Sequence, residues 1–141
     1  MAIQFFTEDI EFNLPDKRKR KAWLKTLANA EDFKIGDLNY IFCSDEHLYQ
    51  INLEYLKHKT YTDIITFDNS EQKELIEGDI FISIERIREN AQKEKVSETD
   101  ELSRVISHGL FHLMGYQDKT KKQAEEMRIQ ENQAIDLFKN L

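Results

Sequence analysis

The chain has 141 residues, which fits one domain with enough material for a hydrophobic core. Apolar residues make up 40% and charged residues 33%, so a disordered chain is excluded. A single cysteine excludes an internal disulfide framework and a cysteine-rich zinc module. No apolar run reaches the ~20 residues of a membrane span, and residues 1–12 do not resemble a signal peptide. We expect one domain over residues 1–141, in a soluble protein of a reducing compartment without a membrane partner.

The charge balance is acidic, because 20 Lys and Arg against 27 Asp and Glu give a net charge of −7. This total argues against nucleic-acid binding by bulk charge, but it leaves room for a local basic face. The candidate is the basic run from Lys17 to Lys21, followed one helical turn later by Lys25. A solvated helix face and an RNA-binding face are both compatible with this run.

Strands and helices alternate early in the chain, and helices dominate late. Apolar and β-branched runs predict the strands, and the run at 62–67 is expected to be buried on both faces of its sheet. We predict strands over residues 3–12, 37–43, 62–67 and 80–84. Helices follow from apolar residues at helical spacing and from N-cap residues such as Ser97 and Thr120. We predict helices over about 15–30, 45–56, 85–95, 98–114 and 121–141.

The expected fold class is α+β, with one mixed sheet of about four strands packed by about five helices. The last helix is expected to bury one apolar stripe. Its members are Ala124, Met127, Ala134, Ile135, Phe138 and Leu141.

The chemically informative stretch is HGLFHLMGYQD at residues 108–118. His108 and His112 lie four residues apart, so both imidazoles fall on one helix face, where they should be half buried. Gly115 permits a left-handed turn that can bring Asp118 back under the histidines. Two nitrogens and one carboxylate oxygen, with a fourth position open, form a catalytic zinc set. We therefore predict that these three side chains bind one Zn²⁺ ion on a late helix and the turn after it; other divalent metals would also fit.

Each part of this motif also has a purely structural explanation. Histidines at this spacing are common on helix surfaces, and Asp118 could belong to the turn before the last helix. The two histidines together with the helix-ending glycine and the acid favour a metal site. Zinc peptidases place a general-base Glu directly after the first histidine, where this chain has Gly109. The peptidase interpretation therefore loses its base, and the sequence identifies no other general base.

The stretch resembles the signature of the YbeY family of bacterial metal-dependent endoribonucleases. The family pattern is His-Gly-x-x-His followed by Gly-Tyr-Asp-His, with three histidine ligands. The chain matches it at His108, Gly109, His112, Gly115 and Tyr116. Asp118 stands where the family usually has histidine. Because Asp is a competent zinc ligand, the resemblance implies a site that is one charge less positive.

A second stretch supports the resemblance. Residues 51–67 (INLEYLKHKTYTDIITF) are similar to the family's Leu-Asn-x-x-Tyr-Arg and Pro-Thr-Asp-Val-Leu-Ser-Phe segments, and residues 78–80 to its Gly-Asp-Ile. The family's arginine falls on Leu56, which cannot form a bidentate phosphate clamp. The candidate substrate-binding residues here are Lys57, His58, Lys59 and Thr62, although an exposed loop is an equally simple interpretation. The candidates for orienting the metal ligands are Asp63, Asp79 and Tyr116, with strand capping or packing as the alternatives.

The resemblance implies a zinc-dependent, single-strand-specific endoribonuclease in the 3′-end maturation of small-subunit rRNA and in ribosome biogenesis. In this hypothesis a metal-activated water attacks the phosphodiester. The resemblance implies single-stranded rRNA and the small ribosomal subunit as partners and the cytoplasm as location. The sequence does not give the oligomeric state, and a monomer is favoured. One alternative is a non-catalytic assembly factor with a structural metal, which would bind the ribosome through the Lys17–Lys25 face. The other is a metal-dependent hydrolase of another substrate.

Overall fold

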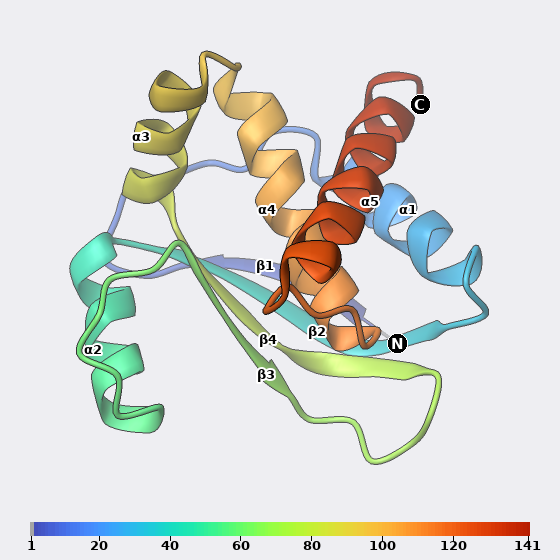
Figure 1. Ribbon diagram of the computed structural model, residues 1–141, viewed down its shortest axis with the longest axis horizontal. Helices are drawn as coiled ribbons and strands as arrows, with labels where there is room; N and C mark the ends of the chain where they lie inside the picture. The colour runs from blue at the N-terminus through green and yellow to red at the C-terminus, as the bar shows by residue number, and fades with distance from the viewer. Residues whose placement is uncertain (1) are drawn as a thin grey trace.

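The fold is built on one four-stranded sheet with helices on both of its faces (Figure 1). The computed structural model describes residues 2–141. The strands in it are β1 (Ala2–Thr7), β2 (Lys34–Cys43), β3 (Ile64–Asp68) and β4 (Leu75–Ser83). The helices are α1 (Lys17–Asn29), α2 (Asp45–Tyr55), α3 (Ile84–Glu94), α4 (Glu98–Leu113) and α5 (Lys121–Lys139). The expected α+β fold is confirmed. None of the helices within residues 2–141 has the length and apolar character to cross a membrane.

The strand order is β1-β2-β4-β3, with β1, β2 and β4 parallel and β3 antiparallel to β4 at the edge. β4 begins at Leu75, earlier than the predicted Ile80. The interpretation of Thr62–Phe67 as a strand buried on both faces is wrong. β3 starts at Ile64, and only Ile65 of its residues is buried. An apolar, β-branched run suits a half-buried edge strand as well as a central one, so the pattern does not reveal the position in the sheet.

Side chains that alternate along the strands supply two hydrophobic clusters. Leu38, Tyr40 and Ile80 belong to the larger cluster, which is covered by α1, α3, α4 and α5. Ile65 and Cys43 belong to the smaller cluster on the opposite face, under α2. Figure 1 shows α2 alone on its side of the sheet. α4 therefore lies over the main core, and its solvent edge faces α5.

Within residues 2–141, four of the five helices have an N-cap side chain that accepts a hydrogen bond from the helix backbone. A serine or threonine oxygen accepts a hydrogen bond from the backbone N–H three residues on, as the sequence predicts for Ser97 and Thr120. Thr120 and Gln123 form the full capping box. The capping residues are Ser44 for α2, Ser83 for α3, Ser97 for α4 and Thr120 for α5. Only α1 begins without a side-chain cap hydrogen bond.

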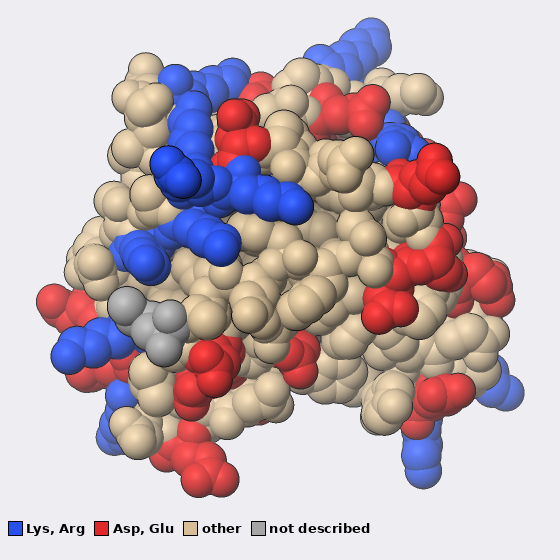
Figure 2. All heavy atoms as spheres, turned by 180° about the vertical axis from the view of Figure 1, so that it is seen from behind, with Lys and Arg blue, Asp and Glu red and all other residues tan. Residues whose placement is uncertain are grey.

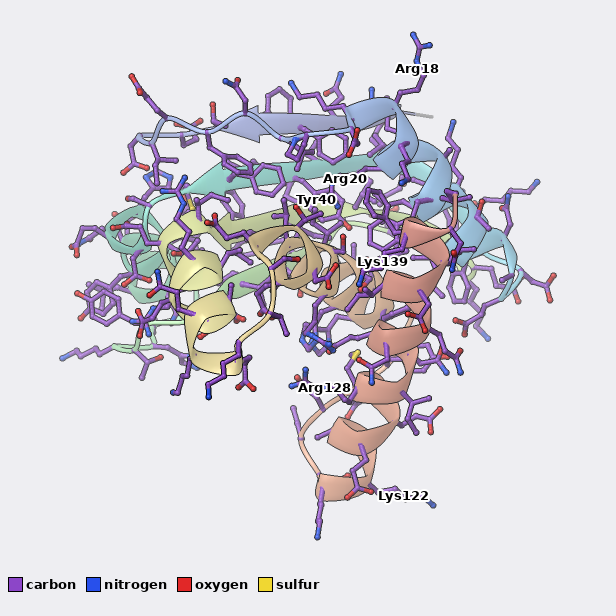
Figure 3. The ribbon with its side chains drawn as sticks, turned by 90° about the horizontal axis from the view of Figure 1, so that it is seen from above. Arg18, Arg20, Tyr40, Lys122, Arg128 and Lys139 are labelled. Atoms are coloured by element: carbon purple, nitrogen blue, oxygen red, sulfur yellow. The ribbon has the colours of Figure 1, made fainter. Side chains whose placement is uncertain are left out.

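The end of β1 and the apolar stripe of α5 also differ from the prediction. β1 ends at Thr7 and not near residue 12, because Asp9 turns into the left-handed region (φ 50°) and its carboxylate accepts hydrogen bonds from Ser44. The inner part of α5 is buried as predicted, but Ala124 and Leu141 are exposed. The first turn of α5 projects beyond the other helices (Figure 3), which leaves Ala124 exposed, and Leu141 lies beyond the C-terminal end of α5.

Candidate metal centre

α4 carries both histidines at the edge of its apolar face. The side chain of His108 is 19% exposed and that of His112 is 26% exposed, so both are half buried as predicted. Gly109 lets this part of the helix lie directly on the sheet. A Cβ at that position would stand 3.0 Å from the Cδ1 atoms of Ile64 and Ile80. This close approach of α4 to the sheet helps to determine how deeply the two imidazoles are buried.

α4 ends in a turn that sends the chain back toward the histidines. Gly115 has φ +103°, a conformation that L side chains rarely adopt. Its N–H donates to the His112 carbonyl, and the Tyr116 N–H donates to the Phe111 carbonyl, both at 3.0 Å. These bonds form a Schellman motif, with the Phe111 and Tyr116 rings in edge contact. The chain therefore reverses, and Asp118 returns to α4.

Three side chains of metal-ligating type converge at this turn. Oδ2 of Asp118 lies 3.3 Å from Nε2 of His108 and 3.7 Å from Nε2 of His112. One ligand atom from each of the three residues lies within 4.8 Å of the other two. Atoms at these separations can share one zinc ion with bonds of about 2.0–2.2 Å. The predicted meeting of the three residues is confirmed, and their role as ligands stays a prediction.

Each imidazole is held by a hydrogen bond on its other ring nitrogen. Nδ1 of His112 donates to the backbone carbonyl of Tyr116 at 3.0 Å. Nδ1 of His108 donates to Oε2 of Glu131 at 2.6 Å. Both Nε2 atoms are thereby left to face Asp118, which is the arrangement that metal-binding histidines usually have.

Glu131 is a site residue that sequence reasoning missed. Its side chain on α5 is 6% exposed, and it also accepts a hydrogen bond from Arg104 at 2.9 Å. In the sequence, Glu131 stands between Met127 and Ala134 on the apolar stripe of α5. An acid at such a position indicates a buried charge that needs a partner. The sequence does not reveal that the partner is His108, because the two residues come from different helices.

The carboxylates around the histidines set their protonation. Burial alone would lower the pKa of His108, but the hydrogen bond and charge of Glu131, together with Asp118, raise it above the ordinary value. Burial and the nearby His108 lower the pKa of His112. Burial favours the neutral form of Glu131, but its bonds to His108 and Arg104 outweigh this effect and lower its pKa. His112 is therefore neutral near pH 7, and Glu131 is ionised.

A cavity of about 340 Å³ opens beside the histidines, between α3, α4 and α5. Its cationic residues are Lys93, Arg104 and Arg128. Arg104 is fixed by hydrogen bonds to Glu131 and Asn132, both at 2.9 Å. Arg128 has a side chain that is 58% exposed, and its closest ion-pair contact is 3.9 Å, to Glu131. Arg128 and Lys93 therefore keep their charges available to a ligand in the cavity. The remaining lining residues are Asp63, Asn90, Glu94, Glu101, Val105, His108 and Asp118.

The predicted orienting residues fall in three different places. Asp63 lines the cavity with His108, and burial raises the pKa of its carboxyl group. Tyr116 faces His112 through its backbone carbonyl, while its hydroxyl donates to Glu31. The Asp79 carboxylate lies on the α2 side of the sheet, where it accepts hydrogen bonds from side-chain amides of two asparagines. The structure therefore does not bring Asp79 to the histidines.

The predicted substrate stretch lies apart from this cavity. Lys57, His58 and Lys59 are exposed on the loop between α2 and β3. The hydroxyl of Thr62 in the same loop donates to the Ile64 carbonyl at 3.4 Å. None of the four is among the residues that line the cavity beside the histidines.

The donor set itself fits a divalent metal ion. It contains two imidazole nitrogens, each oriented by a hydrogen bond on the other ring nitrogen, and one carboxylate oxygen, and His108 and Asp118 also line the cavity. Three protein ligands and an open position are typical of catalytic zinc, and hydrogen-bonded histidines are typical of its surroundings.

Comparison with known proteins decides the family. The family model described as endoribonuclease YbeY matches residues 2–139, nearly the whole chain. This chain belongs to the YbeY family. The endoribonuclease YbeY of Cytophaga hutchinsonii is 53% identical over 97% of this chain and 96% of its own length. That of Christiangramia forsetii is 46% identical over 96% of this chain and 94% of its own. The resemblance stated from the motifs is thus confirmed.

A solved structure shares the fold of this chain. The solution structure of TM1509 from Thermotoga maritima matches with a TM-score of 0.68 and 22% sequence identity, over 97% of this chain and 89% of that one. At this identity the likeness shows the fold alone.

Proposed function

We propose that this chain is a metal-dependent endoribonuclease that hydrolyses phosphodiester bonds in single-stranded rRNA, with residues 1–141 acting as one catalytic domain. The observation that carries the proposal is the convergence of His108, His112 and Asp118 beside an open cavity, in a member of the YbeY family. We propose these three residues as the metal ligands and Zn²⁺ as the ion, because this donor set is typical of catalytic zinc.

Hydrogen bonds within the chain already orient the proposed ligands for a divalent ion in the absence of substrate. The chemistry that a bound ion supplies is Lewis acidity toward the phosphodiester and the attacking water. Glu131 and the Tyr116 carbonyl hold the imidazoles so that both Nε2 atoms face one point. The two imidazoles therefore need little rearrangement when a metal ion binds.

The cations of the cavity bind the RNA backbone on either side of the scissile bond. Arg128 and Lys93 lie on opposite walls, on α5 and α3, and neither is held by a close ion pair. The guanidinium of Arg128 can donate two parallel hydrogen bonds to a phosphate, which Lys93 cannot. Arg128 thus supplies the planar clamp that Leu56 cannot supply.

Asp63 is the proposed proton acceptor for the attacking water. Its carboxyl group lines the same cavity as His108 and Asp118, and burial raises its pKa toward neutral pH. A base with such a pKa takes a proton from water more readily than an ordinary exposed carboxylate does.

The partner, location and oligomeric state are proposals that go beyond the family match. We propose the small ribosomal subunit as partner, the cytoplasm as location and a monomer as the working form. The exposed loop with Lys57, His58, Lys59 and Thr62 is proposed to contact RNA that lies outside the cavity. Co-sedimentation with purified small subunits tests the partner, and light scattering tests the oligomeric state.

The proposal is tested by cleavage of an end-labelled single-stranded RNA. Parent, His112→Ala and His47→Ala proteins are compared, each with Zn²⁺ and with chelator. His47 lies on α2, on the other side of the sheet, so its variant is a matched control for loss of a histidine. We expect cleavage only by the zinc-loaded parent and the His47→Ala protein. Equal cleavage by the His112→Ala protein would contradict the proposal.

A further inference from the structure

α1 presents four cations in one stripe along its exposed side. Lys17, Arg18, Lys21 and Lys25 are all exposed, and we call them the α1 stripe. At about 100° and 1.5 Å per residue they fall within an arc of roughly 100° and a length of about 12 Å. Figure 2 shows Lys and Arg gathered on this face, with no comparable cluster elsewhere in that view.

In the part of the chain that the structure describes, the cations of the stripe have no close ion-pair partner. α1 contains no acidic residue, although the whole chain carries a net charge of −7. Within residues 2–141, no carboxylate oxygen lies within 4.0 Å of a stripe nitrogen. Cations elsewhere do have such partners, as Arg86 has Asp45 and Lys139 has Asp100. The stripe is therefore a local reversal of the overall charge.

This placement works against the stability of α1. Lys17, Lys21 and Lys25 follow one another at i, i+4 spacing, where like charges repel. The stripe also begins at the helix N-terminus, where the helix dipole already disfavours cations, and Asp16 there makes no side-chain cap hydrogen bond. Trp23 and Leu24 anchor the helix in the core without help from the stripe. Local rules are broken in this way mainly where function requires it.

A buried cation lies beneath the stripe and adds to its field. Arg20 is 0% exposed, its Nε donates to the Pro15 carbonyl, and Nη1 donates to the hydroxyl of Ser103. Its guanidinium also lies over the ring of Phe138. Burial lowers the pKa of Arg20 to about 10, so it is still charged at neutral pH. Figure 3 shows Arg18 pointing out from α1 and Arg20 pointing into the molecule.

We propose that the α1 stripe binds the phosphodiester backbone of RNA at a distance from the cleavage site. The identity of the ligand rests on the proposed endoribonuclease function. Figure 3 places Arg18 on the outer side of α1, and Arg128, which lines the cavity, on the other side of α5. The stripe therefore holds a part of the RNA that is remote from the scissile bond.

RNA fits the stripe better than an anionic membrane does. A helix that lies on a membrane buries an apolar face among the lipids. The apolar face of α1 is already occupied, because Trp23 and Leu24 are fully buried in the core. What α1 offers outward is a row of hydrophilic cations, which matches the evenly spaced phosphates of a nucleic-acid strand.

The test compares two variants that each lose four positive charges. The stripe variant changes Lys17, Arg18, Lys21 and Lys25 to Gln, which preserves helix propensity. The control variant changes four exposed lysines from other parts of the surface to Gln, namely Lys34, Lys73, Lys95 and Lys122. Binding of a labelled single-stranded RNA of roughly 40 nucleotides, longer than the molecule at about 3.4 Å per nucleotide, is followed by fluorescence anisotropy. Chelator is present, so that no cleavage accompanies binding.

We expect the stripe variant to bind the RNA about 10- to 100-fold more weakly than the parent at 0.1 M salt. The slope of log K against log salt should become shallower by about 2 to 3, at roughly 0.7 per lost phosphate contact. The control variant should change affinity by less than about threefold. Thermal unfolding of the stripe variant should occur at the same or a higher temperature, because repulsion within α1 is relieved.

Equal losses in the two variants would overturn the proposal, since bulk charge alone would explain them. Unchanged RNA affinity of the stripe variant would also overturn it, and stripe-dependent binding to phosphatidylserine vesicles in that case would assign the surface to a membrane. The failure of the enzymatic proposal is distinguishable. A parent protein that binds RNA through the α1 stripe but does not cleave it would refute the endoribonuclease activity and would still support RNA binding by the stripe.

Discussion

At the level of single residues, each histidine of the centre is fixed by a hydrogen bond on the ring nitrogen that faces away from Asp118. For His108 the acceptor is the carboxylate of Glu131, at 2.6 Å. A charged acceptor strengthens this bond and makes the imidazole a better ligand.

The change Glu131→Gln tests this contribution. It keeps the size of the side chain but removes its charge, and we expect the affinity for Zn²⁺ to fall about 10- to 100-fold. The affinity is measured by competition with a coloured chelator. Glu126→Gln is the control, because Glu126 is an exposed acid on the same helix. An unchanged affinity in the Glu131→Gln protein would show that Glu131 does not tune the site.

Arg128 gives a second prediction at this scale. If its guanidinium clamps a phosphate, Arg128→Gln should lower kcat/KM for RNA about 10- to 150-fold, since a hydrogen bond to a charged group contributes roughly 1.5–3 kcal/mol. Arg88→Gln removes another exposed arginine, from α3 and outside the cavity, and should leave kcat/KM unchanged. The two kinetic profiles are measured at one fixed salt concentration. A similar loss in both variants would point to bulk charge.

Asp63 gives a prediction of pH dependence. A carboxyl group accepts a proton only in its ionised form, and burial raises the pKa of Asp63 above its ordinary value. kcat/KM should therefore rise with pH up to this raised pKa and be lost as the pH falls through it. In Asp63→Asn this acid limb should disappear together with most of the rate. Zinc occupancy is checked at each pH, and a variant that keeps both rate and acid limb would exclude Asp63 as the base.

At the level of elements, the centre depends on the turn that ends α4. Gly115 has φ +103°, and nothing lies within 4 Å of the place where a Cβ would stand. Gly115→Ala therefore adds backbone strain without a clash, and we expect a loss of about 1–2 kcal/mol in the free energy of unfolding. This corresponds to a melting temperature lower by roughly 2–8 °C. Calorimetry measures the shift, and no shift would mean that the turn relaxes freely.

The elements also show what a sequence can and cannot reveal. The His108–His112 pair, the glycine turn and Asp118 were predictable because helix geometry and turn chemistry act over a few residues. Glu131 was not, since its contact with His108 joins two helices. The edge position of β3 was missed for the same reason, because strand order is set by long-range pairing. Sequence reasoning therefore found the three residues that converge but only part of their surroundings.

At the level of the whole molecule, the cations proposed to contact RNA lie in two regions of an acidic protein. Arg128 and Lys93 line the cavity, and the α1 stripe lies on another face. A long RNA that contacts both regions is held at two points, so the second contact forms at a high effective concentration. A short RNA reaches only the cavity. Neutralising the stripe should therefore affect long substrates and spare short ones.

Metal binding should also register in the stability of the whole fold. The three proposed ligands join α4 to the segment after it, and an ion that binds only the folded chain stabilises that chain by mass action. At a Zn²⁺ concentration 100 times the dissociation constant the gain is about 2.7 kcal/mol, which corresponds to a melting temperature higher by roughly 5–11 °C for a domain of this size. The shift is measured by calorimetry with and without Zn²⁺. It should vanish in the His112→Ala protein and persist in the His47→Ala protein; an equal shift in both would place the ion elsewhere.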